Sequence, residues 1–150
     1  MSIQKINGVN IGKYYTFNGI FAAAVWSPQD GITYYAGARP SLSTTSTSAI
    51  SRVYVPQGGT ITKSYLFVAV DGTVGSGETS TIAIIKNGAT GSPTTVSAAV
   101  TTNSAANVFS NTALSISVAT GDYIEWRWIC PTWATNPTNV RIWCTALVEV

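Results

Sequence analysis

Apolar and polar residues alternate along most of the chain, in short runs separated by glycine, proline and asparagine. A run in which every second residue is apolar is typical of a β-strand with one face in a core, because successive side chains of a strand point to opposite faces. No window shows the period of an amphipathic helix. The pattern predicts strands at 20–26, 32–36, 49–55, 60–70, 78–86, 94–102, 106–109, 114–118, 123–130 and 140–150.

The heaviest apolar load lies in the stretch VATGDYIEWRWICP, residues 118–131. The run that ends at Val118 is followed by a turn at Gly121-Asp122, and we expect the strands on either side to form a hairpin. One face of the second strand is predicted to lie in the core, and it carries Ile124, Trp126, Trp128 and Cys130. The other face is predicted to point outward, because the opposite charges of Glu125 and Arg127 suit a solvent-exposed face. It carries Tyr123, Glu125, Arg127 and Ile129.

Strands at this spacing, joined by turn residues such as Asn87-Gly88, predict an all-β fold: a single antiparallel jelly-roll β-sandwich at residues 20–150. Residues 1–19 precede the first predicted strand and are interpreted as a short N-terminal arm. The arm adds an edge strand or reaches a neighbouring subunit, with a frayed terminus as the alternative. Its candidate anchor residues are Ile3, Ile6, Val9 and Ile11.

The chain has 150 residues and few charges: 9% of its residues are charged, against about 25% in an average soluble domain. A surface with so little charge is poorly protected from association, so we expect copies of the chain or a partner to cover part of it. The net charge of +2 comes from scattered residues, and no basic run indicates nucleic-acid binding. No apolar run approaches the ~20 residues that span a bilayer, and the first residues lack a signal-peptide pattern. We therefore expect the chain to be made in a cytoplasm and not to insert into a membrane.

Residues suited to catalysis are scarce. Histidine is absent, which removes the commonest general base, and the six acidic residues form no pair that the sequence selects. We expect a protein that is not an enzyme and that binds no metal or other cofactor. Cys130 and Cys144 both lie on apolar faces, where buried free thiols are expected, with a disulfide between the sheets as the alternative.

Aromatic residues are the remaining candidates for contact with a ligand or another subunit: Tyr35, Trp133 and Trp143. Trp133 stands in a proline-bounded loop, which makes it the best-placed candidate for an exposed tryptophan, and Trp143 lies opposite the core face of the last strand. Either ring could stack on a sugar. Packing is the favoured interpretation, with Trp133 folded over the end of the sandwich and Trp143 against another subunit.

Four segments carry a resemblance to a known family: RVYVPQGGTITKSYLFVAV (52–70), IAIIKNG (82–88), FSNTALSISVATGDYIEWRW (109–128) and PTWATNP (131–137), ahead of a closing apolar strand. Together they resemble the small jelly-roll domains of tailed-bacteriophage structural proteins, which look like trimeric heads of the tumour-necrosis-factor and C1q type. The resemblance covers roughly residues 49–150. It implies a homotrimer at the virion surface that decorates the capsid or recognises a host, and it implies no catalytic residues.

The sequence therefore predicts a virion surface structural protein, a trimeric capsid decoration or head-fibre protein that docks through its arm onto the major capsid protein or another virion component. The short arm, low charge and lack of acid–base residues favour this hypothesis. The alternative is a receptor- or glycan-binding tip domain of a phage tail fibre, which would use Trp133 and neighbouring loops on a host cell-surface glycan.

Overall fold

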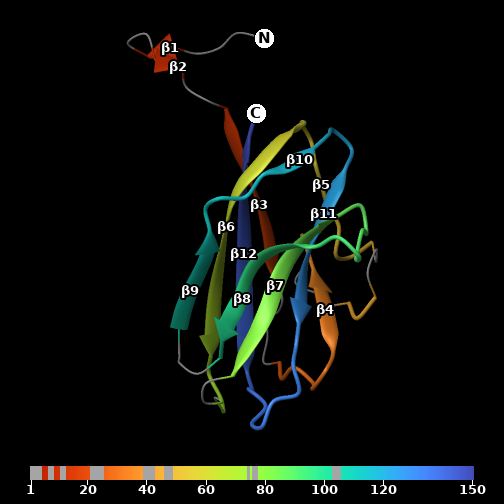
Figure 1. The fold of residues 1–150 in the computed structure, drawn as a ribbon, viewed down its shortest axis with the longest axis vertical. Helices are drawn as coiled ribbons and strands as arrows, with labels where there is room; N and C mark the ends of the chain where they lie inside the picture. The colour runs from red at the N-terminus through yellow and green to blue at the C-terminus, as the bar shows by residue number, and fades with distance from the viewer. Residues whose placement is uncertain are drawn as a thin grey trace.

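In the computed structural model, two antiparallel β-sheets pack against each other to form a β-sandwich (Figure 1). The structure describes residues 5–6, 9–10, 13–20, 26–38, 43–45, 49–73, 75, 78–102 and 106–150. Within these ranges every regular element is a strand, and no helix is long and apolar enough to cross a membrane. The prediction of an all-β sandwich is thus confirmed.

The first sheet, which we call the β6–β12 sheet, contains β3 (Tyr14–Ile20), β6 (Gly59–Val70), β9 (Ala106–Asn111), β10 (Ile116–Val118) and β12 (Val140–Glu149). Its order is β10-β6-β12-β3, and β9 also pairs with β6. Since β12 occupies one edge of β6, β9 and β10 share the other edge. The strand predicted at 60–70 is therefore central in its sheet, as its apolar character indicates.

The second sheet, which we call the β7–β11 sheet, contains β4 (Thr33–Ala36), β5 (Val53–Tyr54), β7 (Thr79–Lys86), β8 (Thr94–Thr101) and β11 (Tyr123–Ile129). Its order is β4-β11-β7-β8. β5 pairs with the first residues of β11, and β4 pairs with the residues that follow them. The strand expected at 49–55 is shorter than predicted, since residues 49–51 form a turn and only Val53 and Tyr54 pair.

The expected hairpin on either side of Gly121-Asp122 is wrong. β10 pairs with β6, whereas β11 lies between β4 and β7 in the opposite sheet. Gly121, with a φ of 89°, turns the chain from one sheet to the other. Both edges of β11 are taken by strands that come from earlier in the chain, so β11 has no edge left for its neighbour in sequence.

The core lies between the two sheets, as the alternation predicts. β12 contributes residues that are at most 1% exposed, namely Val140, Ile142, Cys144, Ala146 and Val148. Across from them, β11 and the residue after it contribute Ile124, Trp126, Trp128 and Cys130, of which none is more than 3% exposed. Both cysteines are free and buried, which confirms the expected thiols, and burial raises the pKa of each.

The residues predicted to form the N-terminal arm, 1–19, have different structures along their length. β1 (Lys5–Ile6) and β2 (Val9–Asn10) pair with each other, with Ile6 opposite Val9. Ile3 and Ile11 lie outside the described residues. Residues 14–19, which the sequence assigns to the arm, belong to β3 and pair with β12, so this part of the arm supplies the edge strand considered for it. The strand expected at 20–26 falls mostly on residues outside the description, and Trp26 is in no strand.

Other parts of the chain extend the edge of the β7–β11 sheet at β4 and cover part of its outer face over β11. Tyr35 exchanges two backbone hydrogen bonds with Ser43, at 2.7 and 3.1 Å, and the Ser51 hydroxyl donates to the Glu125 carboxylate. Glu125 is 0% exposed, so the expectation that its charge faces solvent is wrong. On the same face, Arg127 is half-buried, and its guanidinium donates to the Thr90 carbonyl at 3.1 Å. The residues around Ser51 and Thr90 thus replace water over this sheet.

Two tight turns lie side by side at one end of the β7–β11 sheet, after β7 and before β11. Asn87 and Gly88 have φ angles of 51° and 71°, and the Ala89 amide donates to the Lys86 carbonyl at 3.0 Å, which is the tight turn expected from Asn-Gly. Asp122 accepts a bond from the Ala119 amide at 2.8 Å and another from the Asn87 side chain at 2.7 Å. These two hydrogen bonds, together with the Lys86 ammonium 3.9 Å from the carboxylate, lower the pKa of Asp122.

The stabilising effect of Asp122 should disappear in acid. Its pKa is lower in the folded chain than in the unfolded one, so it stabilises the fold above about pH 4 and ceases to do so as the pH falls through the folded pKa. We expect wild type to exceed Asp122→Asn in urea midpoint at pH 7, and the difference to shrink steadily down to pH 2. Repeating the series at about 1 M salt screens Lys86, so the remaining difference reports the hydrogen bonds. A difference that is constant with pH would contradict this assignment.

Candidate interaction surface

The outer face of the β6–β12 sheet carries a row of large exposed side chains. Val108, Phe67 and Trp143 are aligned across β9, β6 and β12. Their exposed fractions are 68%, 40% and 36%, respectively. The rings of Phe67 and Trp143 are 5.3 Å apart and inclined at 49°. Contacts between cross-strand neighbours stabilise sheets, so this row forms a continuous apolar ridge across three strands.

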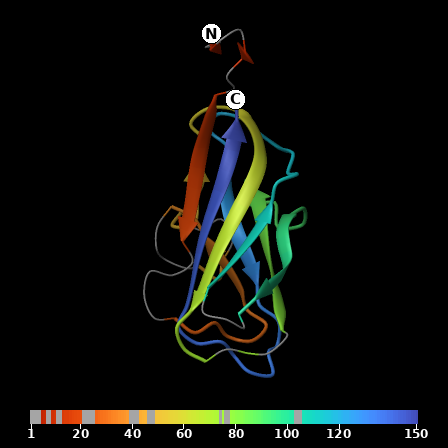
Figure 2. The same cartoon turned by 90° about the vertical axis from the view of Figure 1, so that its left-hand side faces the viewer.

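The next row along the same strands is also free of charge. Tyr65, which is 43% exposed, lies between Ser110 and Thr145, and the Thr145 hydroxyl donates to the Asn18 side chain at 2.9 Å. Figure 2 looks onto this sheet, with β3, β12 and β6 side by side. We call Tyr65, Phe67, Val108 and Trp143 the aromatic face.

Charged residues stand at the two ends of the sheet and leave its middle neutral. Toward one end are Lys63 and Glu149, and at the other Arg141 forms an ion pair with Asp71. Each end therefore carries charges of both signs. Such a surface can approach another copy of itself without repulsion between like charges.

The exposed side chains of the aromatic face form one contiguous apolar patch. Each aromatic side chain has about 150–250 Å² of surface, so the four residues of the aromatic face present on the order of 300 Å² or more of contiguous apolar area. Patches of this size frequently mark interaction sites. On the opposite sheet, by contrast, the residues around Ser51 and Thr90 cover the outer side of Glu125 and Arg127.

The predicted contact residues have different environments. Trp143 is exposed on the outer face, as predicted. The packing interpretation of Trp133 is confirmed: this residue is 5% exposed, its ring lies 6.2 Å from that of Trp128, and its backbone amide donates to Asp30 at 3.1 Å. Trp133 is therefore not available as an exposed contact residue. Tyr35 is also unsuited to a ligand contact in this structure, because it is 7% exposed beneath the segment at Ser43.

Sequence analysis missed Phe67, Tyr65 and Val108 as surface residues. The run SYLFVAV is apolar on both faces, and such a run was interpreted only as a central strand. A strand can be central in its sheet and still have an uncovered outer face. The available signal was the pair Tyr65 and Phe67 at alternate positions, in register with Trp143 on the partner strand.

The described residues offer little for catalysis or metal binding. No group of three or more cysteine, aspartate and glutamate side chains is arranged there to hold a metal ion. The thiols of Cys130 and Cys144 are buried, and their raised pKa disfavours the nucleophilic thiolate. The exposed side chains of the aromatic face are suited to packing against another molecule.

No protein-family model matches the chain, and no curated protein matches it. Among solved structures it is similar to the crystal structure of FLHE, with a TM-score of 0.47 and 8% identity, over 93% of this chain and 98% of that one. It is also similar to the capsid asymmetric unit of cyanophage Pam1, with a TM-score of 0.43 and 17% identity, over 98% of this chain and 94% of that one. At these scores and identities neither likeness carries an argument about function.

Proposed function

We propose that this chain is a non-enzymatic structural protein of a virion surface, that it forms a homotrimer, and that it docks onto the major capsid protein or another virion component through its N-terminal arm. The observation that carries the proposal is the exposed, uncharged aromatic face on the outer side of the β6–β12 sheet. The resemblance of residues 49–150 to phage structural domains supplies the virion location and the number of copies.

The strand order supports a jelly roll. β4 and β5 pair with the same edge of β11, and β9 and β10 with the same edge of β6, so the strands occupy eight positions, four in each sheet. Eight strands in two sheets is the jelly-roll number. The chain also crosses between the sheets after β3, β5, β6, β8, β10 and β11.

The composition of the aromatic face supports self-association. Tryptophan and tyrosine dominate the energetics of protein interfaces, and the centre of an interface is depleted in charge. The ridge of Val108, Phe67 and Trp143 has this character, and hydroxyl and amide side chains flank it on the side of Tyr65. A standard interface buries about 800 Å² per partner, so the ridge would form its centre and the surrounding polar residues its rim.

The trimer is tested by the molar mass in solution, measured by light scattering behind a sizing column. Wild type should have the mass of three chains. Val108→Lys combined with Phe67→Lys should be monomeric, because two buried ammonium groups without partners oppose association. The matched control is Tyr54→Lys, which changes a residue that is 58% exposed on β5, outside the aromatic face, and should leave the trimer intact. Far-UV circular dichroism establishes that each variant is folded.

A monomeric wild type at its highest soluble concentration would contradict the trimer, as would a lysine variant that keeps the wild-type mass. The virion location has its own test: gradient-purified particles are analysed for the chain by mass spectrometry and immunogold labelling. Deletion of residues 2–12 removes the arm yet leaves all of β3, and it should abolish binding to particles. The proposed location is wrong if purified particles lack the chain, and the proposed anchor is wrong if the truncated chain binds normally.

A further inference from the structure

An open pocket of about 400 Å³ lies at one end of the outer face of the β6–β12 sheet. Residues of β3, β6 and β12 line it: Tyr14, Thr62, Lys63, Leu147 and Glu149. Its volume is in the range of about 300–1,000 Å³ that is usual for small-molecule sites. The lining residues nearest the ridge are Lys63 and Leu147, which are four residues from Phe67 and Trp143 along β6 and β12, about 13 Å at ~3.3 Å per residue, so the pocket lies beyond the ridge toward the end of the sheet.

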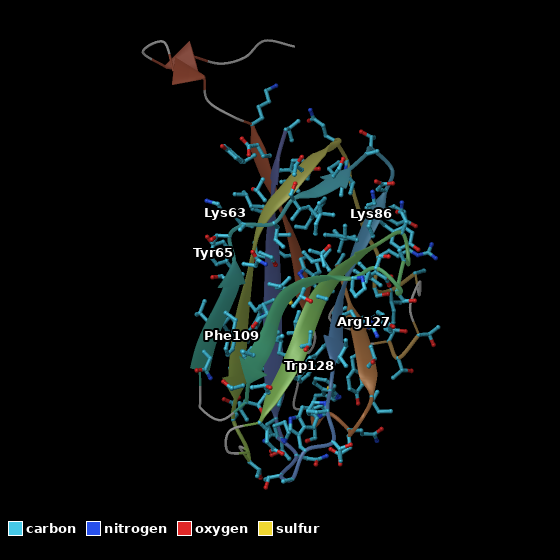
Figure 3. All side chains as sticks on the ribbon, in the orientation of Figure 1. Lys63, Tyr65, Lys86, Phe109, Arg127 and Trp128 are labelled. Atoms are coloured by element: carbon cyan, nitrogen blue, oxygen red, sulfur yellow. The ribbon has the colours of Figure 1, made fainter. Side chains whose placement is uncertain are left out.

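A β-bulge builds the pocket. Leu147 pairs with Lys63 and Val148 pairs with Ile61, so Thr62 is an extra residue without a partner on β12. In a regular strand, Ile61 and Lys63 would lie on the same face because they are two residues apart, and the face of Ile61, which is 0% exposed, points inward. Bulges re-aim side chains in this way. Figure 3 shows Lys63 and Tyr65 on the same side of β6, where the bulge has turned the lysine outward.

The polar groups of the pocket are available for a ligand. The Lys63 ammonium has no hydrogen-bond or ion-pair partner among the residues described here, and it forms no ion pair with Glu149. Glu149 accepts one long bond, from the Tyr14 hydroxyl at 3.4 Å. Tyr14 is 54% exposed, and Leu147 adds apolar surface beside it. The pocket therefore combines an aromatic ring, an aliphatic side chain and one charge of each sign.

We propose that this pocket binds a neutral hexopyranose unit of a glycan. A pyranose has an apolar face of C–H groups that can lie on the Tyr14 ring, and hydroxyls that can accept from Lys63 and donate to Glu149. An anionic ligand would meet the Glu149 carboxylate, and a cationic ligand would meet the Lys63 ammonium. A purely apolar ligand would leave both charges without partners. The inference goes beyond the proposed structural function and does not depend on it.

Saturation-transfer NMR on the intact chain tests the proposal, with galactose, glucose and N-acetylglucosamine as neutral probes and with sialic acid and glucosamine as charged comparators. At least one neutral sugar should receive saturation, mainly on the protons of its apolar face, and the charged sugars should not. Tyr14→Ala should weaken binding roughly tenfold, whereas Tyr14→Phe should retain most of it because the ring remains. Glu149→Gln should weaken binding less than Tyr14→Ala.

Tyr54→Ala is the matched control, because Tyr54 is 58% exposed and lies far from the pocket in the other sheet, and this variant should bind like wild type. The proposal is overturned if no neutral sugar receives saturation, if a charged sugar is preferred, or if Tyr14→Ala binds unchanged. The readout is independent of molar mass. A failure here therefore leaves the trimer standing, and a monomeric chain leaves the sugar site standing.

Discussion

Trp128→Ala should lower the free energy of unfolding by about 3–5 kcal/mol, the loss usual for a large aromatic residue removed from a core. Trp128 is 0% exposed and lies among three other rings, with centroid distances of 5.3 Å to Trp26, 6.2 Å to Trp133 and 6.3 Å to Tyr34. Its indole N–H also donates to the buried Ser80 hydroxyl at 2.7 Å. Because a domain of this size is typically stable by only 5–15 kcal/mol, the variant should be close to unfolding. Urea titration followed by far-UV circular dichroism measures the loss without relying on tryptophan fluorescence.

Trp126 provides the matched comparison within the same strand. It is equally buried, but its indole N–H has no hydrogen-bond partner among the described residues. Trp128→Phe leaves the Ser80 hydroxyl without its donor, whereas Trp126→Phe removes a polar group that had no partner. We therefore expect Trp128→Phe to cost about 1–3 kcal/mol more than Trp126→Phe. Equal costs for the two phenylalanine variants would contradict a structural role for the hydrogen bond to Ser80.

The second large effect is expected at the buried carboxylate. Ser51→Ala should destabilise the chain by about 1.5–3 kcal/mol, because Glu125 loses a hydrogen bond in a place that water does not reach. Glu125→Ala should cost at least as much, because it removes the acceptor of the equally buried Ser51 hydroxyl and also leaves a cavity. Both values come from urea midpoints at pH 7, again followed by circular dichroism.

The double variant separates the pair from its surroundings. If the Ser51–Glu125 contact holds the segment around Ser51 on the sheet, the double variant should be more stable than the sum of the two single losses predicts, by about 1–3 kcal/mol. Ser115→Ala is the control, since Ser115 is exposed and such changes usually stay within about 0.5 kcal/mol. Strict additivity of the two losses would mean that the two side chains stabilise the fold independently.

Glu125 also illustrates what period-two alternation leaves open. The pattern correctly divides β11 into two faces and places the tryptophans of one face in the core. It contains no information on whether a distant segment covers the other face. Here the segment around Ser51, far from β11 in the sequence, covers Glu125, and a position that the pattern assigns to solvent is fully buried.

The aromatic face shows the opposite outcome from the same kind of pattern. Tyr65 and Phe67 are apolar enough to suggest burial, yet the described chain brings nothing over the outer side of β6 beside them. Trp133 has the turn residues of an exposed loop around it, yet its ring fills space next to Trp128. Composition alone does not distinguish these cases, because burial depends on which segments meet in three dimensions.

The features that could be predicted from the sequence depend on neighbouring residues only. They are the positions of most strands, the tight turn at Asn87-Gly88, the inward faces of β11 and β12, and the buried thiols. These follow from side-chain alternation and from backbone angles that few residues tolerate, which are properties of neighbouring residues. Tertiary structure alone decided that β10 and β11 belong to different sheets, that Glu125 and Trp133 are buried, and that a bulge at Thr62 turns Lys63 outward. Each of these depends on how segments distant in the chain pair with or cover one another. A local sequence pattern contains no information on that pairing or its register.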